Sequence, residues 1–186
     1  MKITQTSLQD AYVIEPRIFN DERGYFLETF SQRKWNEVLP EYQWVQDNLS
    51  VSTKGTLRGL HLQRGNNAQT KLVRVSQGEV LDVIVDLRPE SSSFKGTFSL
   101  ELSAKNQKQL LVPRGFAHGF VVLSDHATFE YKCDNFYAPQ SETGLAFNDP
   151  DLAIDWKLTP NQFVLSPKDQ ILPSLKDFLA QEFNLS

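Results

Sequence analysis

The chain has a single cysteine, Cys133, among its 186 residues. One cysteine excludes an internal disulfide framework and a metal cluster held by several thiolates, and it fits a reducing compartment best. Basic residues are also fewer than acidic ones: the chain has 19 lysines and arginines and 23 aspartates and glutamates, which gives a net charge of −4. We therefore expect no nucleic-acid surface, which would need a basic field. A few local arginines are still enough to bind a small anionic molecule.

Long apolar runs are missing as well. The N-terminal stretch "MKITQTSLQDAYVIEP" is polar and alternating, without the apolar core of a signal peptide. No later stretch is long enough to span a bilayer, and no repeat, low-complexity run or linker-like change of composition interrupts the chain. We expect a soluble cytoplasmic protein of one domain, residues 1–186, with no membrane partner.

Apolar side chains at every second position predict a protein made mainly of strands. Residues 81–87 alternate in this way around Asp82 and Asp86, and residues 98–102 repeat the pattern. Both runs are interpreted as half-buried strands. Turn sequences at 76–78, 88–93, 104–107 and 123–126 separate such runs at short intervals, which is typical of an antiparallel sandwich or barrel.

Helical signals are confined to two places. In residues 31–40, Ser31 is a suitable N-cap and Pro40 a suitable stop. In residues 174–183, Leu175, Phe178 and Leu179 fall at helical spacing, with Glu182 one turn further on. This second helix is expected to pack one apolar stripe on the strands.

The heptapeptide "LRGLHLQ", residues 57–63, combines an imidazole and a guanidinium in one strand. His61 and Gln63 share one face, and Leu60 and Leu62 share the other. The pair of Arg58 and His61 suggests a neutral histidine beside an anion-binding arginine; the alternative is a strand-edge histidine with an unrelated surface arginine. Outward Leu60 and Leu62, together with short N-terminal strands, predict a homodimer, because they would otherwise leave apolar surface exposed.

A second motif, "VPRGFAHGF", spans residues 112–120. Its Pro113, Gly115 and His118 form a rigid turn followed by a flexible position and an imidazole. This spacing resembles the second motif of the cupins, double-sheet jelly rolls whose lumen holds the site. The fold class implied is mainly β, a cupin-type jelly roll with short peripheral helices, one of them C-terminal.

The cupin metal set is incomplete in this chain. Metal-binding cupins supply His-x-His and then a glutamate from their first motif, whereas here Gln63 replaces the second histidine, and Asn67 and Ala68 are not acidic. Two imidazoles without a third strong ligand make a poor divalent site. We therefore expect no metal.

Lys71 and Tyr131 stand among apolar neighbours on two further strands. Lys71 shares a face with Val73 and Val75, and Tyr131 shares one with Phe129. We expect both side chains to point into the lumen; the alternative is that they extend to its rim.

A neutral histidine, a lysine and a phenol together suit proton transfer at a carbon beside a carbonyl. Removing such a proton makes an enolate, so the site needs a base, a cation at the oxygen and an acid to return the proton. An acid on the face opposite the base inverts the stereocentre.

Five longer motifs extend the resemblance beyond the cupin fold. They are "RGYFLETF" (23–30), "VQDNLSVSTKGTLRGLHLQ" (45–63), "KLVRVSQGEVLDVIVDLR" (71–88), "VPRGFAHGF" and "NFYAPQSETGLAFNDPDLAIDW" (135–156). The chain is similar in these motifs to the dTDP-4-dehydrorhamnose 3,5-epimerases, cofactor-free enzymes of dTDP-L-rhamnose synthesis. The resemblance implies a homodimer that epimerises C3 and C5 of dTDP-4-dehydro-6-deoxy-D-glucose.

The resemblance also implies roles for individual residues. His61 matches the base, Asp169 the carboxylate that holds it, Lys71 the residue beside the substrate carbonyl, and Tyr131 the acid. The remaining matches are ligand-binding positions: Arg23, Glu28, Gln46, Asn48, Arg58, His118, Tyr137, Glu142 and Lys168. Alternatives stay open for two of them, a turn residue for Arg23 and a solvated loop acid for Glu142.

Two positions depart from the family pattern. Leu62 stands where an aromatic residue is usual, and Phe147 where tryptophan is usual, so nucleotide or sugar selectivity could differ. Three alternatives to double epimerisation remain: epimerisation at one carbon, ketoisomerisation of a related dTDP-sugar, and sugar-nucleotide binding without catalysis.

Overall fold

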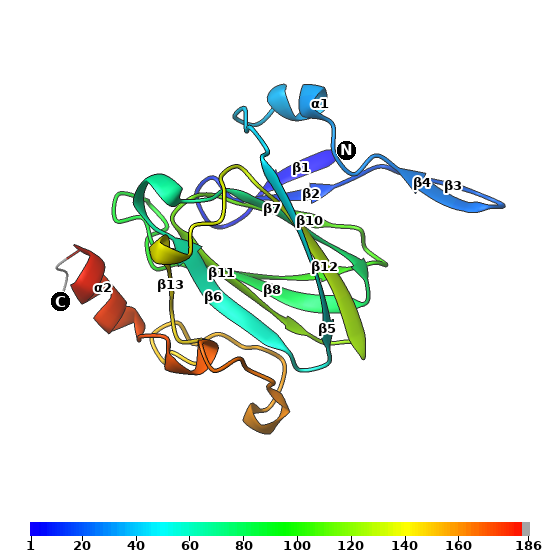
Figure 1. The fold of residues 1–186 in the computed structure, drawn as a ribbon. Helices are drawn as coiled ribbons and strands as arrows, with labels where there is room; N and C mark the ends of the chain where they lie inside the picture. The colour runs from blue at the N-terminus through cyan, green and yellow to red at the C-terminus, as the bar shows by residue number, and fades with distance from the viewer. Residues whose placement is uncertain (184–186) are drawn as a thin grey trace.

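Residues 1–183 are described by the computed structural model, in which two antiparallel sheets lie face to face (Figure 1). The six-stranded sheet has the order β1 (Lys2–Gln5), β2 (Tyr12–Glu15), β10 (Gln109–Val112), β7 (Lys71–Gln77), β12 (His126–Cys133), β5 (Gln46–Thr53). The five-stranded sheet has the order β13 (Glu142–Gly144), β6 (Leu57–Gln63), β11 (Phe116–Val122), β8 (Glu79–Asp86), β9 (Thr97–Ser103). Many neighbours in space are distant in sequence, as in a jelly roll, so the predicted fold class is confirmed.

Three apolar clusters hold these layers together. The inner cluster lies between the sheets and takes Val73 and Phe129 from one sheet and Ile84 and Phe120 from the other. An outer cluster covers the far side of the five-stranded sheet under the C-terminal segment, and another covers the far side of the six-stranded sheet around Trp35. Removal of this apolar surface from water is the main favourable term in the fold.

Strand β8 is buried on both faces, so its interpretation as a half-buried strand is wrong. Val83 and Val85 join the outer cluster, and Ile84 joins the inner one. Asp82 and Asp86, expected on a wet face, are both 0% exposed. The facing six-stranded sheet covers the side of β8 that carries Ile84 and Asp82, and the local pattern of β8 does not encode that cover. The alternation over β9 is confirmed.

Leu60 and Leu62 do not lie on an open face either. They are 0% and 8% exposed, and they pack in the outer cluster with Leu175 and Phe178. The prediction of outward apolar side chains is therefore wrong, because the C-terminal segment of the same chain covers them. These two leucines are not available to a second subunit.

Both predicted helices are present. Helix α1 (Gln32–Asn36) begins after Ser31, although the Ser31 side chain makes no capping hydrogen bond, and it ends before Pro40. Helix α2 (Leu175–Phe183) buries Leu175, Phe178 and Leu179, as its spacing predicts. Within the described residues, neither helix has the length and apolar character to cross a membrane.

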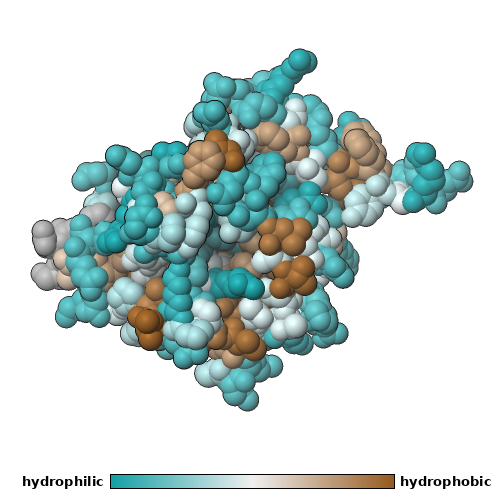
Figure 2. All heavy atoms as spheres, viewed as in Figure 1, coloured by the Kyte–Doolittle hydropathy of each residue, from teal (hydrophilic) through white to brown (hydrophobic). Residues whose placement is uncertain are grey.

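Strands β3 (Ile18–Asp21) and β4 (Gly24–Leu27) form a hairpin that projects away from the two sheets (Figure 1). Its tip is hydrophilic, and apolar side chains gather at its base (Figure 2). Phe19, Tyr25 and Phe26 on this hairpin are 48%, 57% and 70% exposed. A two-stranded hairpin is marginal in water on its own, so further contacts would stabilise it.

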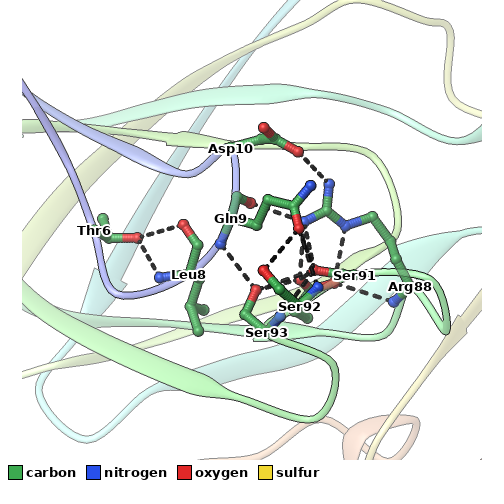
Figure 3. A network of polar contacts seen from close by, with 9 residues as sticks. Thr6, Leu8, Gln9, Asp10, Arg88, Ser91, Ser92 and Ser93 are labelled. Carbon is green, nitrogen blue, oxygen red and sulfur yellow. Dashed lines mark hydrogen bonds and ion pairs between the residues drawn. The ribbon is translucent and has the colours of Figure 1, made fainter.

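A polar network ties the N-terminal loop to the end of β8 (Figure 3). Arg88 donates from Nε and Nη2 to the two carboxylate oxygens of Asp86 at 2.9 and 2.8 Å, and from Nη1 to Asp10 at 2.9 Å. Ser91 and Ser93 donate to Asp86 Oδ2 at 2.5 and 2.7 Å. Burial would raise the pKa of Asp86, but these hydrogen bonds outweigh it and hold the pKa below its ordinary value. Asp86 is therefore a buried anion whose charge is fully compensated.

Candidate active site

A cavity of about 540 Å³ opens between the two sheets. Its walls come from β5, β6, β7, β11 and β12, and residues 164–166 and 169 of the C-terminal segment close one side. Small-molecule sites span roughly 300–1,000 Å³, so the cavity has the size for such a ligand. Predicted site residues line much of it: Asn48, Arg58, His61, Lys71, His118, Tyr131 and Asp169.

His61 is held by a carboxylate on one side of its ring. Its Nε2 lies 2.5 Å from Oδ1 of Asp169, which sits in the short 3-10 helix η4 (Asp169–Ile171). Ser166 donates its hydroxyl to Asp169 Oδ2 at 2.8 Å. Burial opposes ionisation of Asp169, but the hydrogen bonds from His61 and Ser166 outweigh it and lower the pKa of this carboxyl. Because a carboxylate only accepts, the imidazole proton belongs on Nε2, and Nδ1 is left as the basic nitrogen.

Lys71 and Tyr131 both point into this cavity, as predicted. Lys71 Nζ lies 6.0 Å from the centroid of the Tyr131 ring. Burial lowers the pKa of Lys71, and the neighbouring Cys133 and Asp82 oppose that shift. Burial raises the pKa of Tyr131, so its phenol stays protonated near neutral pH and can serve as an acid.

His61 and Tyr131 come from opposite sheets. His61 lies on β6 of the five-stranded sheet, and Tyr131 lies on β12 of the six-stranded sheet. A ring bound between the sheets therefore meets the imidazole on one face and the phenol on the other. This is the arrangement that inversion of a stereocentre requires.

A second pair of imidazole and carboxylate lies beside the first. His118 is the direct partner of His61 across β6 and β11, and its Nε2 lies 2.8 Å from Oδ2 of Asp82. Burial raises the pKa of Asp82, and His118 opposes the shift. Within residues 1–183, Oδ1 of Asp82 is buried without a hydrogen-bond partner. The sequence interpretation missed Asp82; the signal was a carboxylate on the inner face of an otherwise apolar strand.

Two glycines let the strands that carry these histidines approach closely. Gly59 has φ +118°, and a Cβ built on it would lie 2.6 Å from the Cα of Gly119. A Cβ on Gly119 would in turn lie 2.6 Å from the carbonyl oxygen of Arg58. Larger residues would push β6 and β11 apart, and with them His61 and His118. The glycine of "LRGLHLQ" is therefore needed for close packing.

At the mouth of the cavity, the predicted binding residues form a chain of polar contacts. Gln46 donates to Asn48 Oδ1 at 2.9 Å and accepts from the Tyr137 backbone amide at 3.0 Å. Tyr137 donates its hydroxyl to Glu142 Oε2 at 2.7 Å, and Lys168 Nζ lies 2.5 Å from the same oxygen. Burial would raise the pKa of Glu142, but these partners hold it below its ordinary value.

Arg58 on β6 lines the cavity beside β5. Its Nε donates to the hydroxyl of Ser52 at 3.2 Å, while the residue as a whole is exposed. The guanidinium can therefore form further hydrogen bonds at the cavity edge.

Arg23 and Glu28 are the predicted site residues that this chain does not bring to its own cavity. Arg23 lies at the tip of the β3–β4 hairpin and pairs with Asp21 at 2.5 Å. Glu28 follows β4 and pairs with Lys34 at 2.7 Å. Both ion pairs are solvent-exposed and contribute little to stability.

The two departures from the family pattern lie outside the cavity wall. Leu62 and Phe147 belong to the outer cluster under the C-terminal segment, and Phe147 stacks edge-on against Phe163 at 5.3 Å between ring centroids. They therefore contact apolar neighbours on the opposite side of β6 from His61. The expectation that they mark selectivity receives no support from this position.

Candidate metal ligands do not gather in the described part of the chain. Across residues 1–183, no group of three His, Cys, Asp or Glu side chains is arranged to hold a metal ion. The expected independence from metals stays a prediction that an experiment must test.

A protein-family comparison agrees with the geometry of this site. The family model described as dTDP-4-dehydrorhamnose 3,5-epimerase matches residues 5–177. The chain belongs to the dTDP-4-dehydrorhamnose 3,5-epimerase family. The resemblance seen in the sequence motifs is therefore confirmed.

Individual members of the dTDP-4-dehydrorhamnose 3,5-epimerase family match over nearly the whole chain. The Escherichia coli enzyme of that name is 48% identical over 180 residues, which cover 96% of this chain and 97% of its own. The crystal structure of the Elizabethkingia anophelis enzyme has 54% identity and a TM-score of 0.91, with coverage of 95% and 97%. A Legionella pneumophila epimerase, solved with dTDP-4-keto-L-rhamnose, has 46% identity and a TM-score of 0.90, with coverage of 94% and 93%.

Proposed function

We propose that this chain, as one epimerase domain over residues 1–186, inverts C3 and C5 of dTDP-4-dehydro-6-deoxy-D-glucose and yields dTDP-4-dehydro-L-rhamnose. The observation that carries the proposal is the pairing of His61, held by Asp169, with Tyr131 on the facing sheet. Family membership and the ligand of the Legionella relative support the same substrate class. The reaction belongs to dTDP-L-rhamnose synthesis.

The mechanism uses the carbonyl at C4, which acidifies the hydrogens on both neighbouring carbons. His61 Nδ1 takes a proton from the carbon, and the electron pair of the C–H bond moves into the enolate. Lys71 lines the same cavity, and its positive charge stabilises the developing oxyanion. Tyr131 then returns a proton from the opposite face, so the configuration inverts. His118, paired with Asp82, faces the same cavity and can form a further hydrogen bond with the sugar.

Product analysis by NMR tests this assignment. Inversion at both carbons supports the proposal. Inversion at one carbon would identify a single-site epimerase, a shifted carbonyl a ketoisomerase, and an unchanged sugar that nevertheless binds would identify a binding protein.

Dialysis against a strong chelator is expected to leave the rate unchanged. The expectation rests on the incomplete cupin ligand set, since Gln63 replaces a histidine and no acid follows at residues 67 and 68. The measurement is the initial rate before and after dialysis, with added divalent ions as the second arm. Loss of activity that one ion restores would contradict the proton-transfer mechanism proposed above.

Replacing Arg58 with alanine is expected to raise KM strongly and to change kcat less. We assign Arg58 to the substrate pyrophosphate, because a guanidinium fork suits bidentate phosphate contacts and charge-assisted hydrogen bonds contribute roughly 1.5–3 kcal/mol each. That corresponds to a rise of about ten- to a hundred-fold in KM. Arg74→Ala, on the outer side of β7, is a matched control. An unchanged KM in a folded Arg58→Ala variant would remove Arg58 from this role.

We also propose a homodimer, with its interface on the β3–β4 hairpin and the outer side of β5. Phe19 and Phe26 on the hairpin and Leu49 and Val51 on β5 are large apolar side chains left exposed. Their burial would stabilise association. Arg23 lies at the tip of the same hairpin and away from its own cavity, so we propose that it contacts the substrate in the cavity of the second subunit.

Sedimentation at micromolar concentration is expected to give a dimer, and Phe26→Ser is expected to weaken it. Mixing inactive Arg23→Ala and His61→Asn chains should restore part of the activity, because one cavity of the mixed dimer then has both residues intact. A wild-type monomer at that concentration would contradict the dimer. Activity that stays absent after mixing, despite subunit exchange, would contradict the shared site.

The compartment proposed is the cytoplasm. Cys133 is a free, buried thiol, and burial raises its pKa to about 11. Such a thiol is compatible with a reducing compartment and with a nucleotide-sugar substrate made there.

A further inference from the structure

Glu142 lies beside the imidazole of His61, on the side of its Nδ1. Its two carboxylate oxygens face different partners: Oε1 lies 4.0 Å from His61 Nδ1, whereas Oε2 contacts Tyr137 and Lys168. The Glu142 side chain is 15% exposed, while that of Lys168 is 50% exposed. One carboxylate therefore connects the basic nitrogen inside the cavity to groups at its mouth.

The other ring nitrogen of His61 leads into the protein. Nε2 is bound to Asp169 Oδ1, and the Asp169 side chain is 4% exposed. The second oxygen of Asp169 is taken by the hydroxyl of Ser166. A proton collected on Nδ1 therefore faces Glu142 rather than Asp169, and Glu142 can pass it on once the sugar nucleotide fills the cavity.

Inverting two carbons requires the base to be reset. Each inversion transfers one proton from carbon to His61 and one from Tyr131 to carbon. After the first inversion His61 is protonated and Tyr131 is deprotonated, so neither can act again in that state. The proton on His61 must leave while the sugar nucleotide still occupies the cavity.

We propose that Glu142 is the proton exit for His61 between the two inversions. The Nδ1–H bond breaks as a bond forms from the proton to Oε1, and the carboxylic acid then releases the proton to water at the mouth. Lys168 and Tyr137 stabilise the restored carboxylate. A carboxylate is a weaker base than an imidazole, but the relay needs it to hold the proton only transiently. A water molecule, or closure of the site on the substrate, spans the 4.0 Å gap.

The inference rests on the proposed double epimerisation and separates Glu142 from a role in substrate binding alone. The test is a single turnover in deuterated water with excess enzyme, followed by NMR of deuterium at C3 and at C5. In Glu142→Gln, exchange at the first carbon should remain near the wild-type rate. Exchange at the second carbon should slow by a factor on the order of ten or more, and a singly exchanged sugar should accumulate. Glu101→Gln, on the exposed side of β9, is the matched control and should behave as wild type.

Chemical rescue gives a second, independent readout. Formate is a small carboxylate that can occupy the space left in Glu142→Ala, and it should accelerate the second exchange in a concentration-dependent way. Wild type should not respond to formate, because its own carboxylate already performs the transfer. Rescue also keeps the proposal testable if the glutamine variant does not fold.

Two results would overturn the proton exit. One is a parallel loss of exchange at C3 and C5 in Glu142→Gln together with a raised KM, and the other is failure of formate to accelerate Glu142→Ala. Either would leave Glu142 as a substrate-binding residue. Failure of the proposed function looks different, because wild type itself would then fail to exchange one or both of the carbons.

Discussion

Asparagine in place of His61 is expected to abolish epimerisation and, with it, exchange of the carbon-bound hydrogens in deuterated water. Asparagine can still contact Asp169 but offers no basic nitrogen, so no enolate forms. The loss should be on the order of 10²–10⁴ in rate, as for other positioned bases. The measurement is the NMR signal of the C3 and C5 hydrogens during incubation with enzyme.

A matched histidine is available as a control for this variant. His126 begins β12, is exposed, and lies outside the cavity wall, so His126→Asn should exchange and epimerise normally. The His61→Asn protein should still bind the sugar nucleotide, because Arg58 and the mouth residues are intact. Continued exchange in the folded His61→Asn variant would mean that another group is the base.

Phenylalanine in place of Tyr131 is expected to separate exchange from inversion. His61 and Lys71 remain, so the enolate should still form and exchange should continue. Without the phenol on the six-stranded sheet, deuterium returns mostly from the base side or from water, and the configuration is largely retained. Net epimerisation should fall by a factor on the order of 10²–10⁴.

The measurement for this variant is the ratio of exchanged to inverted sugar. Tyr42→Phe is a suitable control, since Tyr42 packs with Trp44 away from the cavity and should not change that ratio. The raised pKa of Tyr131 adds a pH expectation: the phenol remains an acid throughout the neutral range, so its contribution should be lost only in strongly alkaline solution. Normal inversion by Tyr131→Phe would exclude Tyr131 as the acid.

Local patterns predicted the class of fold because period two is a property of single strands. Lys71 and Tyr131 were placed on inner faces by their neighbours Val73 and Phe129, and the structure agrees. The same reasoning failed for β8 and for Leu62. The side of β8 that carries Asp82 is covered by the facing sheet, and Leu62 is covered by the C-terminal segment. Short-range alternation carries no information about covers that are distant in sequence.

Some residues of the site could be predicted from the sequence, and others could not, for a similar reason. Motif similarity pointed to His61, Asp169 and Tyr131, because the proposed reaction requires these residue types at these positions. Asp82 was missed because a single carboxylate in a strand pattern suggests a solvent-facing position, and only the opposite imidazole of His118 explains its burial. The contact of Glu142 with His61 was also beyond sequence reasoning, since it depends on β13 pairing with β6.

The pairing of His61 with Asp169 joins positions 108 residues apart. The segment that carries Asp169 lies near the C-terminus. It contacts β6 through backbone hydrogen bonds such as that from Leu57 N to the carbonyl oxygen of Val164 at 3.0 Å. During synthesis the chain emerges N-terminus first, so the strands of both sheets leave the ribosome before the residue that orients the base. A chain that ends before Asp169 therefore lacks both the carboxylate that holds His61 and the apolar cover of Leu60 and Leu62. Such truncated chains should neither catalyse the proposed reaction nor keep that face of the five-stranded sheet buried.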